Sequence, residues 1–175
     1  MPQKILIVVD MQNDFVDGSL GTPEAQAVLP RVIDKIRRQL AAYGLDSVLY
    51  TMDTHQEDYL STQEGRNLPV RHCIRGTDGW QLHPEVRALL LPQSVIIEKG
   101  GFGAPSLPKA VPSDAAVELV GLCTGICVIS NAVILKTAFP EMEISIDASC
   151  CACVSPESHE RALAAMELLQ FKIER

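Results

Sequence analysis

Cys127 is the residue of this sequence best placed to act as a nucleophile. It follows an apolar run, Ala115 to Val120, across a short turn that leads into a helix-like segment. The first N–H groups of a helix lack partners within it and carry partial positive charge, which lowers the pKa of a thiol beside them. The sequence therefore predicts a reactive thiol at position 127.

Two charged residues at the ends of other apolar runs complete a catalytic set with this thiol. Asp10 ends the run from Ile5 to Val9, and Lys99 follows the run from Val95 to Glu98. Ligands of an open parallel α/β sheet bind beyond the carboxyl ends of its strands, so the three side chains are expected to face one crevice. Asp10 is then the general base for the thiol, and Lys99 stabilises the charges of the pair. Singly each residue has an ordinary structural explanation, but together they favour catalysis.

Acyl transfer to a thiol also needs donors for the oxyanion that forms on the substrate. The backbone N–H groups of Cys123 and Cys127, on the same turn, are the predicted donors, each worth roughly 3 to 4 kcal/mol in the transition state. No nucleotide-binding loop competes with this assignment, because the stretch from Gly100 to Gly103 has neither the spacing nor the helix that such a loop requires.

A second group of side chains suits a divalent metal ion. One carboxylate and two imidazoles are the predicted ligands: Asp53, His55 and His72. Such a set suits Zn²⁺, with Mn²⁺ or Fe²⁺ as alternatives. The spacing leaves the fourth ligand open between Glu64 and Glu57. The alternative is that both histidines make ordinary hydrogen bonds in a loop.

The elements that position these groups alternate between strands and helices. Strands are predicted over residues 5–9, 47–52, 94–98, 115–120, 143–146 and 171–173, and helices over 23–43, 84–90, 125–137 and 156–169. Strands that are apolar along most of their length indicate a parallel sheet covered on both faces. The predicted fold is a three-layer, doubly wound α/β sandwich with a mostly parallel sheet and Rossmann-like topology.

Two helices and one long loop carry further local signals. Ser155 followed by Pro156 predicts a capped helix start, and the helix from residue 125 is apolar on most faces, so we expect it to be largely buried. Residues 53–83 are polar and show no sustained period. A polar segment of this length in a compact domain is usually functional.

Length and composition indicate one domain with a small-molecule partner. The 175 residues suit a single domain over 1–175, and 47% hydrophobic residues allow a sizeable core. The net charge of −7 argues against a nucleic-acid or anionic-membrane surface. The apolar run at 5–9 is too short for a signal peptide, and no run approaches the roughly 18 residues that span a bilayer. A cytoplasmic location is therefore predicted.

The chain contains six cysteines, three of them close together at Cys150, Cys151 and Cys153. Without an export signal, free thiols are favoured over disulfides. No second cysteine pair accompanies this cluster, so structural or bystander thiols are favoured over a zinc site.

The motifs that hold these residues resemble those of a known family. They are Val8 to Phe15, Asp53 to His55, His72 to Thr77, Glu98 to Gly100 and Gly121 to Val128. In this order and over residues 5 to about 170, they resemble the isochorismatase-like cysteine hydrolase superfamily. Within it, the sequence is most similar to the nicotinamidases, also called pyrazinamidases.

The resemblance implies an activity and the roles of individual residues. It implies a catalytic triad of Asp10, Lys99 and Cys127, with a cis peptide before Cys123. It implies a metal on Asp53, His55 and His72, with Glu64 as the better match for the fourth ligand, and in the family this metal contacts the pyridine nitrogen. The implied reaction is the conversion of nicotinamide to nicotinate and ammonia through a thioester, as in NAD salvage, and the implied assembly is a homo-oligomer.

Departures from the family pattern concern the substrate. Leu68 stands near the position where nicotinamidases have an aromatic residue against the ring, and Gly125 replaces the usual aspartate after Thr124. Phe15 remains where a pocket-lining aromatic is expected, and Phe102 is a second candidate. Arg71, beside His72, is either a solvated surface residue or a partner for an acidic substrate group.

Other functions remain open at this stage. The nearest is hydrolysis of another small amide or carbamoyl compound, of the ureidoacrylate or N-carbamoylsarcosine type. Isochorismatase activity is less favoured, because vinyl-ether hydrolysis would leave Cys127 without a role. A non-catalytic metal-binding or thiol redox protein is the alternative from a different class.

Overall fold

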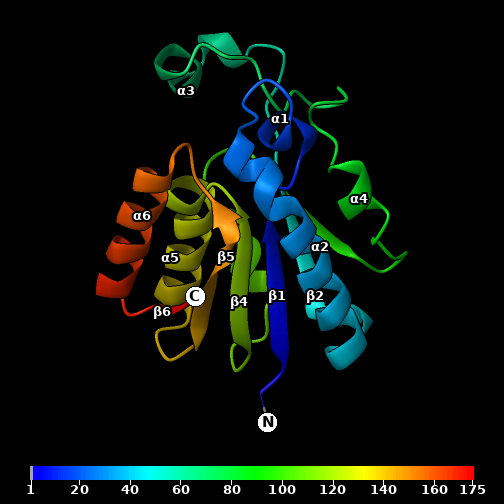
Figure 1. Cartoon of the computed structure of the whole chain (residues 1–175), viewed down its shortest axis with the longest axis vertical. Coiled ribbons are helices and arrows are strands. Elements are labelled where there is room, and N and C mark those ends of the chain that lie inside the picture. Colours follow the sequence, from blue (N-terminus) through cyan, green and yellow to red (C-terminus); the bar gives the residue numbers. More distant parts are fainter. Residues whose placement is uncertain (1) are drawn as a thin grey trace.

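The computed structural model describes residues 2–175 and contains a six-stranded sheet. The strands are β1 Lys4–Val9, β2 Val48–Asp53, β3 Val95–Lys99, β4 Ala116–Leu122, β5 Ile144–Ala152 and β6 Lys172–Glu174. Their order is β3-β2-β1-β4-β5-β6, and every pairing is parallel. The chain starts in the middle of the sheet and winds outwards in both directions, which confirms the predicted doubly wound fold (Figure 1).

Helices cover both faces of the sheet. They are α1 Asn13–Val16, α2 Pro23–Tyr43, α3 Gln63–Asn67, α4 Pro84–Arg87, α5 Ile129–Ala138 and α6 Pro156–Leu168, with short 3₁₀ turns at Leu45–Ser47, Tyr59–Ser61 and Leu107–Lys109. α5 and α6 lie on one face, and α2 lies on the other (Figure 1). None of the helices within residues 2–175 is long and apolar enough to cross a membrane.

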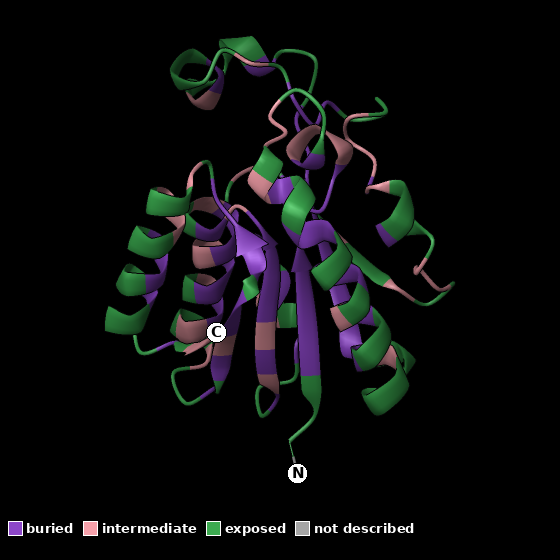
Figure 2. Cartoon of the chain, viewed as in Figure 1, coloured by how far each residue is buried: buried purple, intermediate pink, exposed green. Residues whose placement is uncertain are grey.

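Alternate residues of β1 divide the core into two layers. Ile5, Ile7 and Val9 pack in the cluster that contains α5 and α6 residues, whereas Leu6 and Val8 pack with α2. Successive side chains of a strand point to opposite faces, so a central strand covered on both sides must be apolar throughout. Figure 2 shows the central strands buried and the outer helix faces exposed.

α2 begins and ends at the predicted residues because both ends have local signals. The hydroxyl of Thr22 accepts the N–H of Ala25 at 3.0 Å, Pro23 occupies the first turn, and Gly44 follows the last residue with φ 87°. A serine, threonine or asparagine before the first turn, and glycine in the left-handed region after the last, are the usual helix limits. The predicted serine cap at the start of α6 is also present, since the Ser155 hydroxyl accepts the N–H of Ser158.

Several predicted bounds are wrong at the carboxyl ends of elements. β5 continues to Ala152 rather than ending at residue 146, because Asp147 is accommodated inside the strand by an ion pair with Lys35 of α2 at 2.8 Å. α4 is only four residues long and ends at Arg87, not at residue 90. The helix expected from residue 125 to 137 is a π-helical turn, Thr124–Val128, followed by α5, and it is less buried than expected because Val133 is 38% exposed.

The polar segment 54–83, after β2, lies beyond the carboxyl ends of the strands. It contains α3 and projects above the sheet at the end opposite both termini, whereas α4, which follows it, lies beside the sheet (Figure 1). Most of its surface is exposed, but His55, Tyr59 and His72 are buried. This segment therefore forms a cover over the edge of the sheet where ligands of such folds bind.

Candidate active site

Asp10, Lys99 and Cys127 lie close together at the carboxyl ends of β1, β3 and β4. The Nζ atom of Lys99 is 2.6 Å from Oδ2 of Asp10 and 3.4 Å from Sγ of Cys127. All three are buried, with exposed fractions of 0%, 3% and 5% for Asp10, Lys99 and Cys127. The structure thus brings together the three residues that the sequence singled out, and it removes them from bulk water.

Burial and mutual charge set the protonation of this cluster. Burial raises the pKa of Asp10, although the charge of Lys99 opposes this effect. Burial would lower the pKa of Lys99, but Asp10, Cys127 and Asp53 hold it above its ordinary value. Burial and the charge of Asp10 raise the pKa of Cys127 well above its ordinary value. This change is opposite in direction to the lowering expected from a helix start, so that prediction is wrong.

The turn before Cys127 has an unusual backbone. The peptide between Leu122 and Cys123 is cis, as the resemblance implied. Cys123 is extended, and its carbonyl accepts the N–H groups of Ile126 and Val128 at 3.1 Å. The π-helical turn that starts here places Cys127 in its fourth position, rather than at its first N–H groups.

Gly121, at the end of β4, is required by the close approach of β1. Its φ of 116° lies in a region that favours glycine, and an added Cβ would lie 2.2 Å from the carbonyl oxygen of Val9. A larger residue would push apart the strands that carry Asp10 and Cys127.

Asp53, His55, Glu64 and His72 converge beside this cluster. One ligand atom from each lies within 4.8 Å of the others. Nε2 of His55 is 2.9 Å from Oδ2 of Asp53 and 3.6 Å from Oε1 of Glu64. The corresponding distances from Nε2 of His72 are 3.6 and 3.8 Å. Two imidazoles and two carboxylates in this arrangement suit a divalent transition metal.

The orientation of His72 and the charge of Asp53 also suit metal binding. Nδ1 of His72 lies 2.8 Å from the carbonyl oxygen of Val70, and the proton shared there leaves Nε2 free to bind a metal. Burial alone would raise the pKa of Asp53, but hydrogen bonds with His55 and His72 and the charge of Lys99 hold it below its ordinary value.

The structure distinguishes between the two candidates for the fourth ligand. Glu57, left open by the sequence, lies on the surface and forms an ion pair with Arg71. Glu64 faces the histidines. Arg71 has Glu57 as its surface partner and does not line the cavity described below, so the structure favours the surface alternative for this residue.

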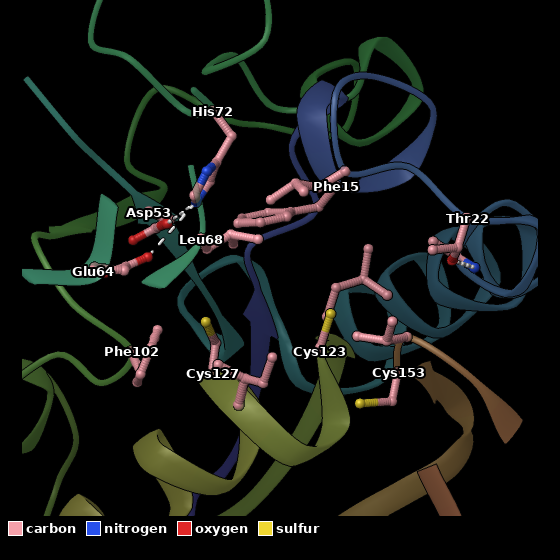
Figure 3. A pocket seen from close by; sticks show the side chains of 15 residues that line it. Phe15, Thr22, Asp53, Glu64, Leu68, His72, Phe102, Cys123, Cys127 and Cys153 are labelled. Carbon is pink, nitrogen blue, oxygen red and sulfur yellow. Dashed lines mark hydrogen bonds and ion pairs between the residues drawn. The ribbon is translucent and has the colours of Figure 1, made fainter. Parts of the chain in front are cut away.

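A cavity of about 190 Å³ connects the thiol of Cys127 to the metal-ligand group at Asp53, Glu64 and His72. Its lining is mainly apolar, apart from Asp53, Glu64, His72 and Thr22, and it includes the thiol of Cys127. Figure 3 shows Phe15 and Leu68 on the side of the metal-ligand group, with Phe102 near Cys127. All three predicted substrate-contact residues, Phe15, Leu68 and Phe102, line this cavity.

Two buried polar residues that sequence reasoning missed hold the acidic groups in place. The hydroxyl of Thr51 donates to Oδ1 of Asp10 at 2.6 Å. Gln12 pairs with the backbone of Asp53, accepting its N–H at 2.7 Å and donating to its carbonyl at 2.8 Å. A threonine within an apolar strand and a glutamine two residues after a strand-end aspartate were the available signals.

Asn131 was also missed and positions the nucleophile. Its side-chain amide donates to the carbonyl of Cys127 at 2.8 Å and accepts the N–H of Ala104 at 2.9 Å. It therefore ties the turn that carries Cys127 to the loop that carries Phe102.

The fold and the site together define a class of doubly wound α/β proteins with a buried Asp-Lys-Cys cluster beside a carboxylate-histidine group. The chain belongs to the isochorismatase family, since the family model described as the Isochorismatase domain matches residues 4–173.

Curated relatives and solved structures agree with this family. The chain is 30% identical over 143 residues to a Bacillus subtilis protein described as the uncharacterized isochorismatase family protein PncA, covering 75% of this chain and 77% of the relative. It is 29% identical over 142 residues to the nicotinamidase/pyrazinamidase of Mycobacterium tuberculosis, covering 71% and 74%. It superposes on the pyrazinamidase of Pyrococcus horikoshii in complex with zinc with a TM-score of 0.80 and 28% identity, covering 99% of each chain.

Proposed function

We propose that this chain is a cysteine amidohydrolase that converts nicotinamide to nicotinate and ammonia. The observation that carries the proposal is the single cavity that joins the thiol of Cys127 to the metal-ligand group at Asp53 and His72. A pyridine carboxamide has a ring nitrogen for the metal and an amide carbon for the thiol. Similarity to nicotinamidases and pyrazinamidases supports the same reaction.

The first half of the reaction forms a thioester. Asp10 takes the proton of the Cys127 thiol, and the thiolate attacks the carboxamide carbon. The N–H groups of Cys123 and Cys127 stabilise the oxyanion. Asp10 returns the proton to the nitrogen as the C–N bond breaks, so ammonia leaves and the acyl group remains on sulfur.

The second half hydrolyses the thioester. Asp10, again unprotonated, accepts a proton from water, and the hydroxide attacks the acyl carbon. The sulfur leaves and regains its proton from Asp10, and nicotinate is released. The raised pKa of Asp10 suits a group that must both accept and donate a proton. Lys99 keeps a positive charge beside the pair throughout.

Asp53, His55, Glu64 and His72 would hold the metal, for which we propose zinc, with Mn²⁺ or Fe²⁺ as alternatives. Such an ion would supply a Lewis acid for the ring nitrogen of the substrate. Phe15, Leu68 and Phe102 enclose the ring from the sides.

One observation favours a second candidate. Leu68, at 39% exposure, offers the ring an aliphatic contact rather than an aromatic face. Leucine in place of an aromatic residue at this position removes ring stacking. This loss lowers the binding free energy of nicotinamide more than that of a smaller or non-aromatic substrate, such as another small amide or a carbamoyl compound.

Ammonia release across a substrate panel tests the proposal. The panel contains nicotinamide, pyrazinamide, N-carbamoylsarcosine, ureidoacrylate and simple amides, each with and without a chelator. The proposal predicts the highest kcat/KM for nicotinamide or pyrazinamide and a loss of activity on chelation. A preference for carbamoyl substrates that survives chelation would reject it in favour of the second candidate.

We also propose that the protein forms a homo-oligomer. The edge strand β3 supports this, because Val95 and Ile96 are 45% and 41% exposed. Sedimentation of the purified protein measures the state directly. The cytoplasmic location stays a prediction of the sequence.

A further inference from the structure

Two thiols that the proposed reaction does not use for bond making lie at the ends of neighbouring strands. In the β4–β5 ladder, Leu122 pairs with Ala152, so Cys123 and Cys153 are the next residues along both strands. Neighbouring strands lie about 4.7 to 4.9 Å apart. Disulfides join Cα atoms about 4.4 to 6.8 Å apart, a range that includes the general spacing of neighbouring strands.

Both side chains belong to the wall of the substrate cavity. Cys123 and Cys153 line it together with Cys127. Figure 3 shows them near each other, on the side of the cavity away from Asp53 and His72. Cys153, although only 5% exposed, also lines a second, more open surface hollow.

The surroundings of Cys153 favour a thiolate. The thiol of Cys123, the hydroxyl of Ser158 and the N–H groups of Gly125 and Val154 lower the pKa of Cys153 to about 5, against the opposite effect of burial. The pKa of Cys123 is raised, first by the neighbouring Cys153 and then by burial. At neutral pH the pair is therefore one thiolate beside one thiol, the state in which exchange and oxidation begin.

Gly125 favours the thiolate form of Cys153 because it has no side chain. A Cβ at this position would lie 3.7 Å from Sγ of Cys153 and 3.1 Å from Cβ of Ala162. A carboxylate here would therefore place a negative charge against the thiolate. The glycine leaves its backbone N–H, which lowers the pKa of Cys153, without a side chain beside the sulfur.

We propose that Cys123 and Cys153 form a redox-modification site, at which a hydroperoxide closes a reversible disulfide in the wall of the substrate cavity. Each of the other thiols has a different setting. Cys150 packs in the α2 layer, Cys151 lies next to the carbonyl of Leu119, and Cys73 lies in the polar segment.

The chemistry balances with hydrogen peroxide as the oxidant. The Cys153 thiolate attacks one peroxide oxygen, the O–O bond breaks, and the released hydroxide takes up a proton to become water, leaving a sulfenic acid. The Cys123 sulfur then attacks the sulfenic sulfur, its proton joins the departing hydroxide, and a second water is released. Two thiols and one peroxide thus give one disulfide and two waters.

Closing this bond is expected to lower amidase activity. It draws Cys123 towards β5, and the N–H of Cys123 is a proposed donor to the oxyanion. It also fixes the two side chains in the cavity wall. This consequence rests on the proposed function, whereas formation of the bond does not.

Peptide mapping of the full-length protein tests the proposal. Reduced protein is treated with equimolar hydrogen peroxide, its free thiols are blocked with iodoacetamide, and it is digested with trypsin. Cleavage after Lys109, Lys136 and Arg161 separates Cys123 from Cys153 into two peptides, 110–136 and 137–161. We expect these peptides to be joined through Cys123 and Cys153, and dithiothreitol to separate them. Joining within 110–136, or oxidation of Cys127 alone, would overturn the proposal.

Matched variants test the pair and its surroundings. Cys153→Ser must abolish the cross-link, whereas Cys150→Ser must keep it. Gly125→Asp adds a charge beside Cys153, and a pKa increase of about 2 units lowers the thiolate fraction at pH 6 about tenfold. Cross-link formation should slow accordingly, while the uncharged Gly125→Asn stays close to the rate of the parent protein. Equal rates for the two variants would contradict the proposed thiolate.

Activity is read in the same samples. Loss of nicotinamide hydrolysis should follow the cross-linked fraction and return with dithiothreitol. A cross-link that leaves activity unchanged would overturn the regulatory consequence. If the parent protein proves inactive on every amide, peptide mapping still shows whether Cys123 and Cys153 form a disulfide. Failure of the proposed amidase activity and failure of the proposed disulfide are therefore distinguishable.

Discussion

Asp53 contacts Lys99 with one carboxylate oxygen and the metal-ligand histidines with the other. Oδ1 lies 3.3 Å from Nζ of Lys99, and Oδ2 lies 2.9 Å from Nε2 of His55. The charge of Lys99 is therefore shared between Asp53 and Asp10. This arrangement couples the metal site to the cluster that carries the nucleophile.

The first prediction concerns this shared carboxylate. Asp53→Asn should lower turnover at least about 100-fold, the scale of a lost acid-base contribution, and excess metal should not restore it. The reason is that the substitution removes a metal ligand and also one of the two negative charges beside Lys99. Steady-state kinetics across a zinc titration measure this. Full recovery at high zinc would mean that the contact with Lys99 is unimportant.

Glu64 should behave differently, because it contacts only the metal-ligand group. Glu64→Gln is expected to weaken metal binding about 10- to 100-fold, with turnover recovering when metal is in excess. Elemental analysis after dialysis gives the bound metal. Glu57→Gln is the matched control, since Glu57 pairs with Arg71 on the surface. Equal metal loss from both variants would contradict the assignment.

Leu68→Trp should improve binding of an aromatic substrate. An aromatic contact is worth about 0.5 to 1.5 kcal/mol, which corresponds to a two- to tenfold lower KM for nicotinamide. Leu60→Trp adds the same side chain to the same polar segment, at a residue that is 46% exposed and does not line the cavity. A similar change in KM for both variants would argue against ring contact at position 68.

The free energy of unfolding should depend on pH through the ion pair between Asp147 of β5 and Lys35 of α2. Burial alone would raise the pKa of Asp147, but hydrogen bonds from Lys35 and Ser149 lower it. A carboxylate with a lowered folded-state pKa stabilises the protein above its unfolded pKa of about 3.9, and this contribution is lost as pH falls through the folded value. Asp147→Asn should therefore destabilise by about 1 to 2 kcal/mol at pH 6 and by less at pH 3.

Urea denaturation at the two pH values measures this difference. Asp34→Asn serves as the control, because Asp34 pairs only across the surface, 3.7 Å from Arg37. A destabilisation by Asp147→Asn that is constant with pH would show that packing rather than charge explains the loss.

The strands, the layer order and the strand-end residues followed from local sequence. β1 and β4 are apolar along most of their length, with Lys4 and Glu118 as exceptions, because both of their faces are covered. This pattern is visible without a structure. Asp10 and Lys99 interrupt or end such runs. Their placement in one crevice then follows from the geometry of parallel sheets.

The remaining features depend on contacts between distant residues. The choice of Glu64 over Glu57 depends on how α3 turns within a polar segment that has no periodicity. The length of β5 depends on Lys35, more than 100 residues earlier in the chain. The protonation of Cys127 depends on its burial beside Asp10, and the helix-start argument could not include that carboxylate.

Ammonia release from nicotinamide by Cys127→Ala tests the central claim most directly. Cys150→Ala provides a matched loss of a buried thiol outside the cavity. We predict that Cys150→Ala keeps most of the parent turnover, that Cys127→Ala loses at least about 10⁴-fold, and that both keep the parent circular dichroism spectrum. Turnover by Cys127→Ala within about tenfold of the parent protein would contradict thiol catalysis at this site.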